Sequence, residues 1–183
     1  GANEDVVVGD SGSLVYVAGE LSQVASTDSA ATAGSGDVIV VGAGIAGEGS
    51  NTVIGGVGAD TITGGAESDA VIGDSGAIHL VNGAFATVDV ACIASTDVDD
   101  SLGGDDVITT GDGDNRVIGG AGSDTITGGA DSDQVLGDHG SLNYTVSGTD
   151  LFTNRLSLLE TVTSAEDGKV WTITGLTLES GEV

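Results

Sequence analysis

The acidic residues of this sequence recur at a fixed spacing that would bring them together in space. Between Ser101 and Leu136 the chain divides into four stretches of nine residues, and the sixth residue of each is Asp or Asn. An earlier run from Ala46 to Ile72 divides in the same way into three stretches. Carboxylate oxygens in glycine-rich turns favour Ca²⁺, whereas zinc would need clustered His or Cys. The sixth residues are Asn51, Asp60, Asp69, Asp106, Asn115, Asp124 and Asp133.

The other positions of each nine-residue stretch explain why these side chains would stack. Glycines permit tight turns with positive φ, where a Cβ would clash. The eighth residue is large and apolar, as at Ile62 and Ile108, and a short extended piece turns it inward. Two stretches then make one coil, and successive coils stack their apolar residues in a column. One such Asp is ordinary turn chemistry, but stacked carboxylates repel one another unless a cation lies between them.

A second and longer period indicates the architecture. The dipeptide Gly-Asp begins at Gly9, Gly73 and Gly137, which are evenly spaced (73 − 9 = 137 − 73 = 64). A fixed long period of this kind is typical of repeat folds. We therefore predict an all-β fold, a parallel β-roll or β-solenoid of nonapeptide coils with longer strand or hairpin excursions. The solenoid would be a single continuous domain of about three units, at residues 5–68, 69–132 and 133–183.

The nonapeptides resemble those of RTX (repeats-in-toxin) calcium-binding β-roll proteins, best over Thr32–Asp74 and Ser101–Asp138. The resemblance implies Ca²⁺ between neighbouring coils, held by sixth-position side chains and turn carbonyls. It implies ligand pairs eighteen residues apart, namely Asn51 with Asp69, Asp106 with Asp124, and Asn115 with Asp133. The two Asn residues depart from the pattern and reduce the negative charge of the turns. Asp112 and Asp114, in the second copy, are candidates to compensate for that loss. The candidate calcium ligands are Asp5, Asp37, Asn51, Asp60, Asp69, Asp74, Asp106, Asp112, Asp114, Asn115, Asp124, Asp133 and Asp138.

Longer segments separate the nonapeptide blocks. Alternating apolar and polar residues between Ala86 and Cys92 predict a strand, and the Asn-Gly pair in Val81–Ala84 predicts a hairpin turn. We expect these excursions to widen the same solenoid, and the divergent third one, Ser141–Trp171, leaves room for a short helix. Cys92 is the one cysteine, and we expect it to be a small buried apolar side chain.

Two short motifs suggest enzymes but do not fit their surroundings. Gly42-x-Gly44-x-x-Gly47 has the spacing of a dinucleotide-binding turn, which needs a helix directly after it. The residues that follow contain a glycine every few positions, and each costs a helix roughly 1 kcal/mol. We interpret Val41–Ile45 instead as an insertion between two coils. The sequence GDSGS at Gly9–Ser13 resembles a protease nucleophile loop, but it recurs with the long period and has a histidine, His139, in its third copy.

The charge of the chain limits its partners. Three Lys and Arg stand against 29 Asp and Glu, so the formal net charge is 3 − 29 = −26. Nucleic acids and anionic membranes bind positive charge, so neither is an expected partner, and divalent cations are the natural counter-charge. No apolar run approaches the roughly 18 residues of a membrane-spanning helix.

These observations predict a structural protein and not an enzyme. We expect a secreted or cell-surface β-solenoid stabilised by Ca²⁺, such as a surface layer, an adhesin stalk, or a matrix or fibre subunit. The alternative is a secretion and folding module of a larger RTX enzyme or toxin, whose catalytic part lies outside these residues. Because solenoid ends are open strand edges, we also expect end-to-end stacking into a homopolymer, or a place within a longer tandem array.

Overall fold

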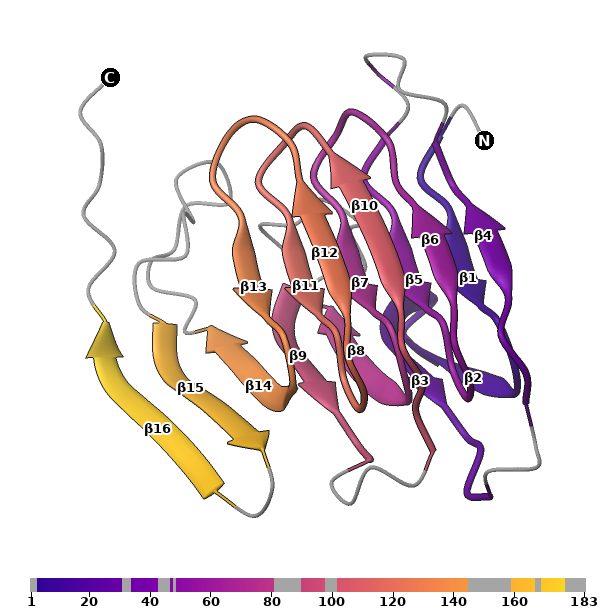
Figure 1. Ribbon diagram of the computed structural model, residues 1–183. Coiled ribbons are helices and arrows are strands. Elements are labelled where there is room, and N and C mark those ends of the chain that lie inside the picture. The colour runs from indigo at the N-terminus through magenta and orange to yellow at the C-terminus, as the bar shows by residue number, and fades with distance from the viewer. Residues whose placement is uncertain are drawn as a thin grey trace.

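The computed structural model describes residues 3–30, 34–42, 47, 49–80, 90–97, 102–144, 159–166 and 169–176. Its strands form three sheets, and these residues contain no helix (Figure 1). The inner parallel sheet consists of β1 (Val6–Val8), β5 (Thr52–Ile54), β7 (Ala70–Ile72), β11 (Arg116–Ile118) and β13 (Gln134–Leu136). The outer parallel sheet consists of β4 (Val38–Val40), β6 (Thr61–Thr63), β10 (Val107–Gly111) and β12 (Thr125–Gly128). The antiparallel sheet consists of β2 (Gly12–Val17), β3 (Glu20–Ser26), β8 (Gly76–Leu80), β9 (Val90–Ser95), β14 (His139–Tyr144), β15 (Leu159–Glu166) and β16 (Lys169–Leu176).

The two parallel sheets are built by alternation, because each nonapeptide contributes one strand to one sheet and the next contributes to the other. From β4 to β7, and again from β10 to β13, the chain passes outer, inner, outer, inner. The eighth-position residues pair in register along each sheet, for example Val53 with Val71 and Ile62 with Ile108. The predicted stacking of these apolar residues into columns is therefore present.

Two sequence separations, 18 and 46 residues, account for most pairs of neighbouring strands in the parallel sheets. Val53 pairs with Val71 (71 − 53 = 18), and Val71 pairs with Val117 (117 − 71 = 46). The longer step is the long period less one coil (64 − 18 = 46), so each excursion leaves the stack and the coiling resumes where it stopped. Ile39 pairs with Ile62 (62 − 39 = 23), a step that equals one coil of eighteen plus the five positions that we interpreted as an insertion.

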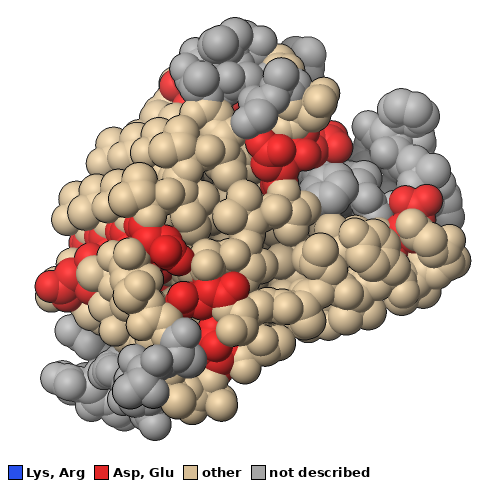
Figure 2. All heavy atoms as spheres, turned by 90° about the vertical axis from the view of Figure 1, so that its right-hand side faces the viewer, with Lys and Arg blue, Asp and Glu red and all other residues tan. Residues whose placement is uncertain are grey.

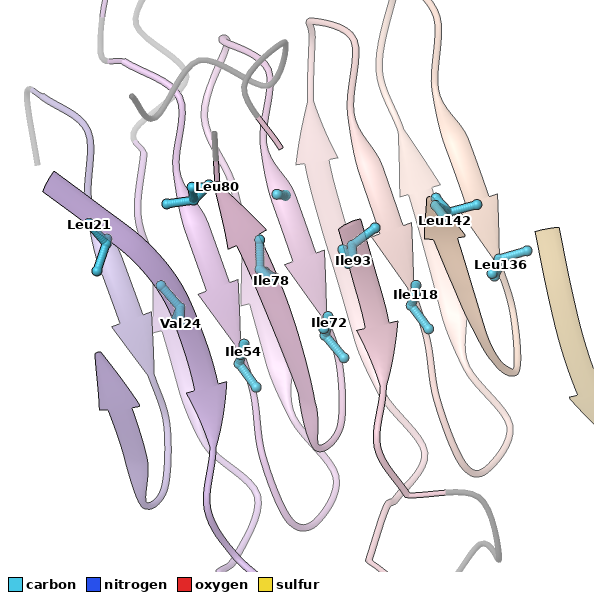
Figure 3. Packing of buried hydrophobic residues seen from close by; sticks show 11 residues of the cluster. Leu21, Val24, Ile54, Ile72, Ile78, Leu80, Ile93, Ile118, Leu136 and Leu142 are labelled. Carbon is cyan, nitrogen blue, oxygen red and sulfur yellow. The ribbon is translucent and has the colours of Figure 1, made fainter. Parts of the chain in front are cut away.

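The inner sheet lies between the other two, and both of its faces are covered. One buried cluster fills the space between the inner and outer sheets and includes Val53, Ile62 and Ile108. A second cluster lies between the inner and antiparallel sheets, where Figure 3 shows Ile54, Ile72 and Ile118 facing side chains of the antiparallel sheet. Its members are Leu21, Val24, Ile54, Ala70, Ile72, Ile78, Leu80, Ile93, Ile118, Leu136 and Leu142. The fold is therefore a three-layered β structure.

The ninth position of the nonapeptide explains why only one parallel sheet is covered on both sides. It is apolar in inner strands, as in Ile54 and Ile118, and threonine in the outer strands β6, β10 and β12, as in Thr63 and Thr127. The outer strand β4 has Val40 there. Residues that flank the eighth position point to the opposite face of the strand. The outer sheet therefore presents polar side chains and a few valines to solvent, whereas the inner sheet has apolar side chains for a second core.

Three expectations from the sequence need correction or lie outside the described residues. The excursions do not widen the parallel coils, because they form the separate antiparallel sheet, whose strands pair with one another. The described parts of Ser141–Trp171 are strands, and the Asn-Gly turn in Val81–Ala84 lies outside the described residues. Cys92 is half-buried in β9 and not fully buried. The part of the chain that the structure describes contains no helix long and apolar enough to cross a membrane.

Candidate metal centre

The sixth-position side chains form two ladders, one along each set of turns. Turns that lead into the outer sheet carry the all-aspartate ladder, which consists of Asp37, Asp60, Asp106 and Asp124. Each backbone N–H donates to Oδ1 of the next rung, with N···O distances of 2.6 Å from Asp37 to Asp60, 2.7 Å from Asp60 to Asp106 and 3.0 Å from Asp106 to Asp124. Because parallel strands repeat at about 4.8 Å, carboxylates on successive coils are close neighbours of like charge.

The second oxygen of every rung in this ladder is buried and accepts no hydrogen bond. These atoms are Oδ2 of Asp37, Asp60, Asp106 and Asp124. The residues Asp60 and Asp106 are each only 1% exposed. A buried carboxylate oxygen without a donor is costly, so four in one row indicate that a positive charge belongs there.

Main-chain oxygens converge on the same places, beside the glycine that begins each turn. A Cβ built on Gly73 would overlap both Oδ2 of Asp106 and the carbonyl oxygen of Gly119. A Cβ on Gly55 would in the same way meet Oδ2 of Asp60 and the carbonyl oxygen of Gly73. The absence of a side chain therefore lets a carboxylate oxygen and a carbonyl oxygen approach one another, as an all-oxygen site for a hard cation requires.

The electrostatics of the all-aspartate ladder oppose ionisation in the absence of a cation. Burial raises the pKa of Asp60 to about 6, and the negative charges of Asp37 and Asp10 add to the rise. Burial also raises the pKa of Asp106 to about 7, reinforced by Asp60 and Asp124. The pKa of Asp124 is raised for the same first reason. A divalent cation between the rungs would reverse this balance, because it favours the charged form.

The aspartates of the Gly-Asp dipeptides that recur every 64 residues lie beside the same ladder. Asp74 is 1% exposed; its Oδ1 accepts a hydrogen bond from the Gly104 N–H at 3.0 Å, and its Oδ2 accepts one from the Ala121 N–H. Burial raises the pKa of Asp74 to about 8, and the charge of Asp106 adds to that rise. Burial is the main cause of the raised pKa of Asp124, and the charge of Asp138 adds to it, so Asp74 and Asp138 are both coupled electrostatically to the all-aspartate ladder.

Turns that lead into the inner sheet carry a second ladder, the mixed ladder, in which Asp and Asn alternate. Its backbone N–H groups also donate to Oδ1 of the next rung, for example from Asn51 to Asp69 at 2.8 Å and from Asp69 to Asn115 at 2.8 Å. Each Asn side-chain amide donates to Oδ1 of the following Asp at 2.9 Å. The rungs in order are Asp5, Asn51, Asp69, Asn115 and Asp133.

Asp112 and Asp114 lie on the exposed side of the mixed-ladder turns. Oδ1 of Asp112 accepts the N–H of Ala130 at 3.0 Å, and Oδ1 of Asp114 accepts the N–H of Ser132 at 3.0 Å. These carboxylates therefore join one turn to the turn of the next coil. In each residue it is Oδ1 that makes this link between coils.

Figure 2 views the molecule from the side on which β1 and β4 lie in Figure 1. On this face Asp and Glu gather in a few patches, and its described atoms include no Lys or Arg. Among the described residues, no group of three or more His, Cys, Asp or Glu side chains could hold a metal ion by itself. A cation on the all-aspartate ladder would therefore need main-chain oxygens to complete its ligand shell.

The structure brings together each predicted pair at the eighteen-residue spacing and adds pairs that the sequence analysis missed. Three missed pairs are 46 residues apart, namely Asp5 with Asn51, Asp60 with Asp106 and Asp69 with Asn115, and a fourth, Asp37 with Asp60, is 23 residues apart. The sequence did contain a signal for the pairs 46 residues apart, because that separation is the long period less one coil (64 − 18 = 46). Asp105 was missed as well; its Oδ1 accepts the N–H of Ser123 at 2.8 Å, and its charge contributes to the raised pKa of Asp106.

Comparison with known families supports the metal assignment. The family model of the RTX calcium-binding nonapeptide repeat, in four copies, matches residues 45–77 and 100–138. The chain carries RTX calcium-binding nonapeptide repeats. Repeats of this family bind Ca²⁺, which agrees with the ion predicted from the carboxylate spacing. The matched RTX residues include the turns of Asp60, Asp106 and Asp124. No curated protein and no solved structure matches the chain.

Proposed function

We propose that this chain is a secreted or cell-surface structural module, a parallel β-roll that Ca²⁺ stabilises. The observation that carries the proposal is the row of four buried, unpartnered Oδ2 atoms in the all-aspartate ladder. The residues proposed to hold Ca²⁺ are Asp37, Asp60, Asp106 and Asp124, with carbonyl oxygens of the turns. When bound, the ion supplies positive charge between rungs that would otherwise repel one another.

A structural role follows from what the ligands would do. Each ion would be bound by ligands from two neighbouring coils, so calcium would stabilise the contacts between coils along the whole stack. An ion that binds only the folded chain stabilises it by roughly 2.7 kcal/mol at a hundredfold excess over its dissociation constant. Three intervals between four rungs would then contribute about 8 kcal/mol, similar to the whole stability of a typical domain. The chain would be only marginally stable at low cytosolic calcium and fully stable outside the cell.

The test is a calcium titration followed by circular dichroism, reversed with EGTA. We expect the unfolding temperature of the β structure to be far lower in chelator than at millimolar calcium. In a double variant, Asp60→Asn with Asp106→Asn, the calcium dependence should weaken strongly. The matched control, Asp112→Asn with Asp114→Asn, removes the same charge from exposed residues whose hydrogen bonds need no metal, and its titration should follow the unaltered chain. A chain that folds equally well in chelator would contradict the proposal.

We also propose that copies associate end to end. In support, β1 and β4 each have one strand neighbour among the described residues, and so does β2 at the end of the antiparallel sheet. All six residues of β2 are exposed, including Val15 at 42%. A strand edge of this kind pairs readily with another chain.

Sedimentation in millimolar calcium tests this association. Val15→Lys should weaken association, because it adds charge to the open edge. Val107→Lys is the matched control, since Val107 is 46% exposed but lies on β10, which is paired on both sides. Sedimentation of the unaltered chain as a monomer alone would contradict end-to-end assembly.

A further inference from the structure

Asn115 is a rung of the mixed ladder whose side chain is fully buried and fully engaged. Its exposed fraction is 0%. Its Oδ1 accepts the N–H of Asp69 at 2.8 Å, so its NH₂ group faces the opposite way, into the turn. There Nδ2 lies 3.0 Å from the carbonyl oxygens of Gly111 and Gly113 and 3.5 Å from that of Asp112. Asn115 therefore places a donor among converging main-chain oxygens.

The same amide also donates a hydrogen bond to the next rung. Nδ2 of Asn115 lies 2.9 Å from Oδ1 of Asp133, and Nδ2 of Asn51 lies 2.9 Å from Oδ1 of Asp69. Because Asn and Asp alternate, no two consecutive rungs of the mixed ladder are both carboxylates. The like-charge repulsion that a cation would relieve is therefore already small in this ladder.

Asp106 is the corresponding rung of the all-aspartate ladder, and its hydrogen bonds differ from those of Asn115. Its Oδ1 accepts the N–H of Asp60 at 2.7 Å, just as Oδ1 of Asn115 accepts the N–H of Asp69. Its second atom, Oδ2, has no hydrogen-bond partner, whereas the second atom of Asn115 has four oxygens within reach. One position of the repeat thus contains an unsatisfied acceptor in one ladder and a satisfied donor in the other.

We propose that the Asn115 side-chain amide takes the place of a calcium ion, so that Ca²⁺ loads the all-aspartate ladder and not the Asn115 turn. This inference rests on the proposed function, because it assigns the calcium to one of the two ladders. The amide donates to the same kinds of oxygen, carbonyl and carboxylate, that would otherwise ligate Ca²⁺. The Asn115 turn is accordingly closed with or without calcium.

The decisive experiment converts the amide into a carboxylate and counts calcium ions. The number of bound ions is measured by isothermal titration calorimetry and native mass spectrometry for the unaltered chain, Asn115→Asp and the control Asn143→Asp. Asn143 lies on β14, and its amide donates to Ser141 Oγ, away from both ladders. We expect Asn115→Asp to bind at least one more ion than the unaltered chain, and Asn143→Asp to bind the same number. An unchanged number in Asn115→Asp would overturn the inference.

The reciprocal variant keeps the inference testable if Asn115→Asp does not fold. Asp106→Asn puts an amide where the all-aspartate ladder has its unpartnered oxygen, beside the Gly119 carbonyl. It should bind fewer ions and, in EGTA, unfold at a temperature several degrees above that of the unaltered chain. If it is no more stable in EGTA, amide replacement is wrong. If the unaltered chain binds no calcium at all, the proposed function fails, while the EGTA comparison still decides whether an amide can replace the ion.

Discussion

The two ladders start from the same nonapeptide and satisfy their sixth-position side chains in opposite ways. In the all-aspartate ladder every rung is a carboxyl group whose second oxygen is left without a donor. In the mixed ladder every other rung is an amide that donates to the next carboxylate. One substitution, Asp to Asn, thus decides whether a turn depends on an external cation. The comparison implies that the turns on one side of the stack open first when calcium is removed.

Replacing one rung of each ladder with alanine should give the largest difference in unfolding free energy between the two ladders. In calcium, Asp106→Ala should cost about 3–5 kcal/mol of unfolding free energy, because it loses bound ions. In EGTA the same variant should be more stable than the unaltered chain, since it removes a buried like charge. Asn115→Ala should instead lose about 1–3 kcal/mol in both conditions, because it leaves buried oxygens without a donor. Urea unfolding with and without calcium measures both effects.

That pair of variants contains its own control, because the sign in EGTA separates the two ladders. Destabilisation of Asp106→Ala in EGTA would show that its carboxylate matters for hydrogen bonding and not for calcium. Calcium-dependent destabilisation of Asn115→Ala would show that the mixed ladder also binds the ion.

The parallel sheets differ at the ninth position as the ladders differ at the sixth. Ile118 is fully buried between the inner and antiparallel sheets, whereas Thr127 is exposed on the outer sheet. Ile118→Ala should cost about 2–5 kcal/mol through lost burial and a residual cavity. Thr127→Ala, at the same repeat position, should change stability by less than about 0.5 kcal/mol. Thermal unfolding in saturating calcium compares the two, and equal losses would contradict the three-layered arrangement.

The regular parts of this fold could be predicted from the sequence because they follow from one short period. The stacking of Val53 on Val71 and the contact of Asn51 with Asp69 both follow from nonapeptide counting. The insertion at Val41–Ile45 followed from the same count and appears as the lengthened step between Ile39 and Ile62.

The third layer could not be predicted in the same way, because it depends on where the excursions pack. Their alternating pattern indicates strands but does not say which sheet they join. The alternation of Ile54, Thr63 and Ile72 at the ninth position did contain the information, since it marks a face that needs a second cover. The direction of the Asn115 amide was beyond the sequence, because it depends on which neighbour occupies its oxygen.

At low pH, protonation should relieve the repulsion among the carboxylates of the all-aspartate ladder, as calcium does at higher pH. The pH dependence of stability therefore tests the electrostatics of this ladder. The folded-state pKa values of Asp60, Asp106 and Asp74 are raised to about 6, 7 and 8 from the ordinary value of 3.8. A raised pKa means that folding favours the protonated acid, so each group destabilises the fold as pH rises from about 4 to about 8. In EGTA we therefore expect the unfolding temperature to rise by several degrees from pH 8 to pH 5.

Calcium should reverse this dependence, because protons then compete with the ion. In saturating calcium the unfolding temperature should fall over the same pH range. The variant Asp60→Asn with Asp106→Asn should weaken the pH dependence in EGTA, since two of the four carboxyls with a raised pKa are gone. If the pH dependence in EGTA keeps its full size in that variant, the titrating groups lie elsewhere.

The smallest expected effect concerns the fourth position of the turns, which also differs between the ladders. Gly122 has φ of 114° in an all-aspartate turn, and Asp131 has φ of 78° at the same position of a mixed-ladder turn. Asp131→Gly should raise stability by only about 0.5 kcal/mol, because relief of the left-handed backbone is partly offset by the entropy of glycine in the unfolded chain. Gly122→Ala should lower stability by about 1–3 kcal/mol, since its Cβ would also meet the Gly104 carbonyl oxygen. Calorimetry in calcium resolves the difference, and a stabilising Gly122→Ala would mean that this turn does not need its glycine.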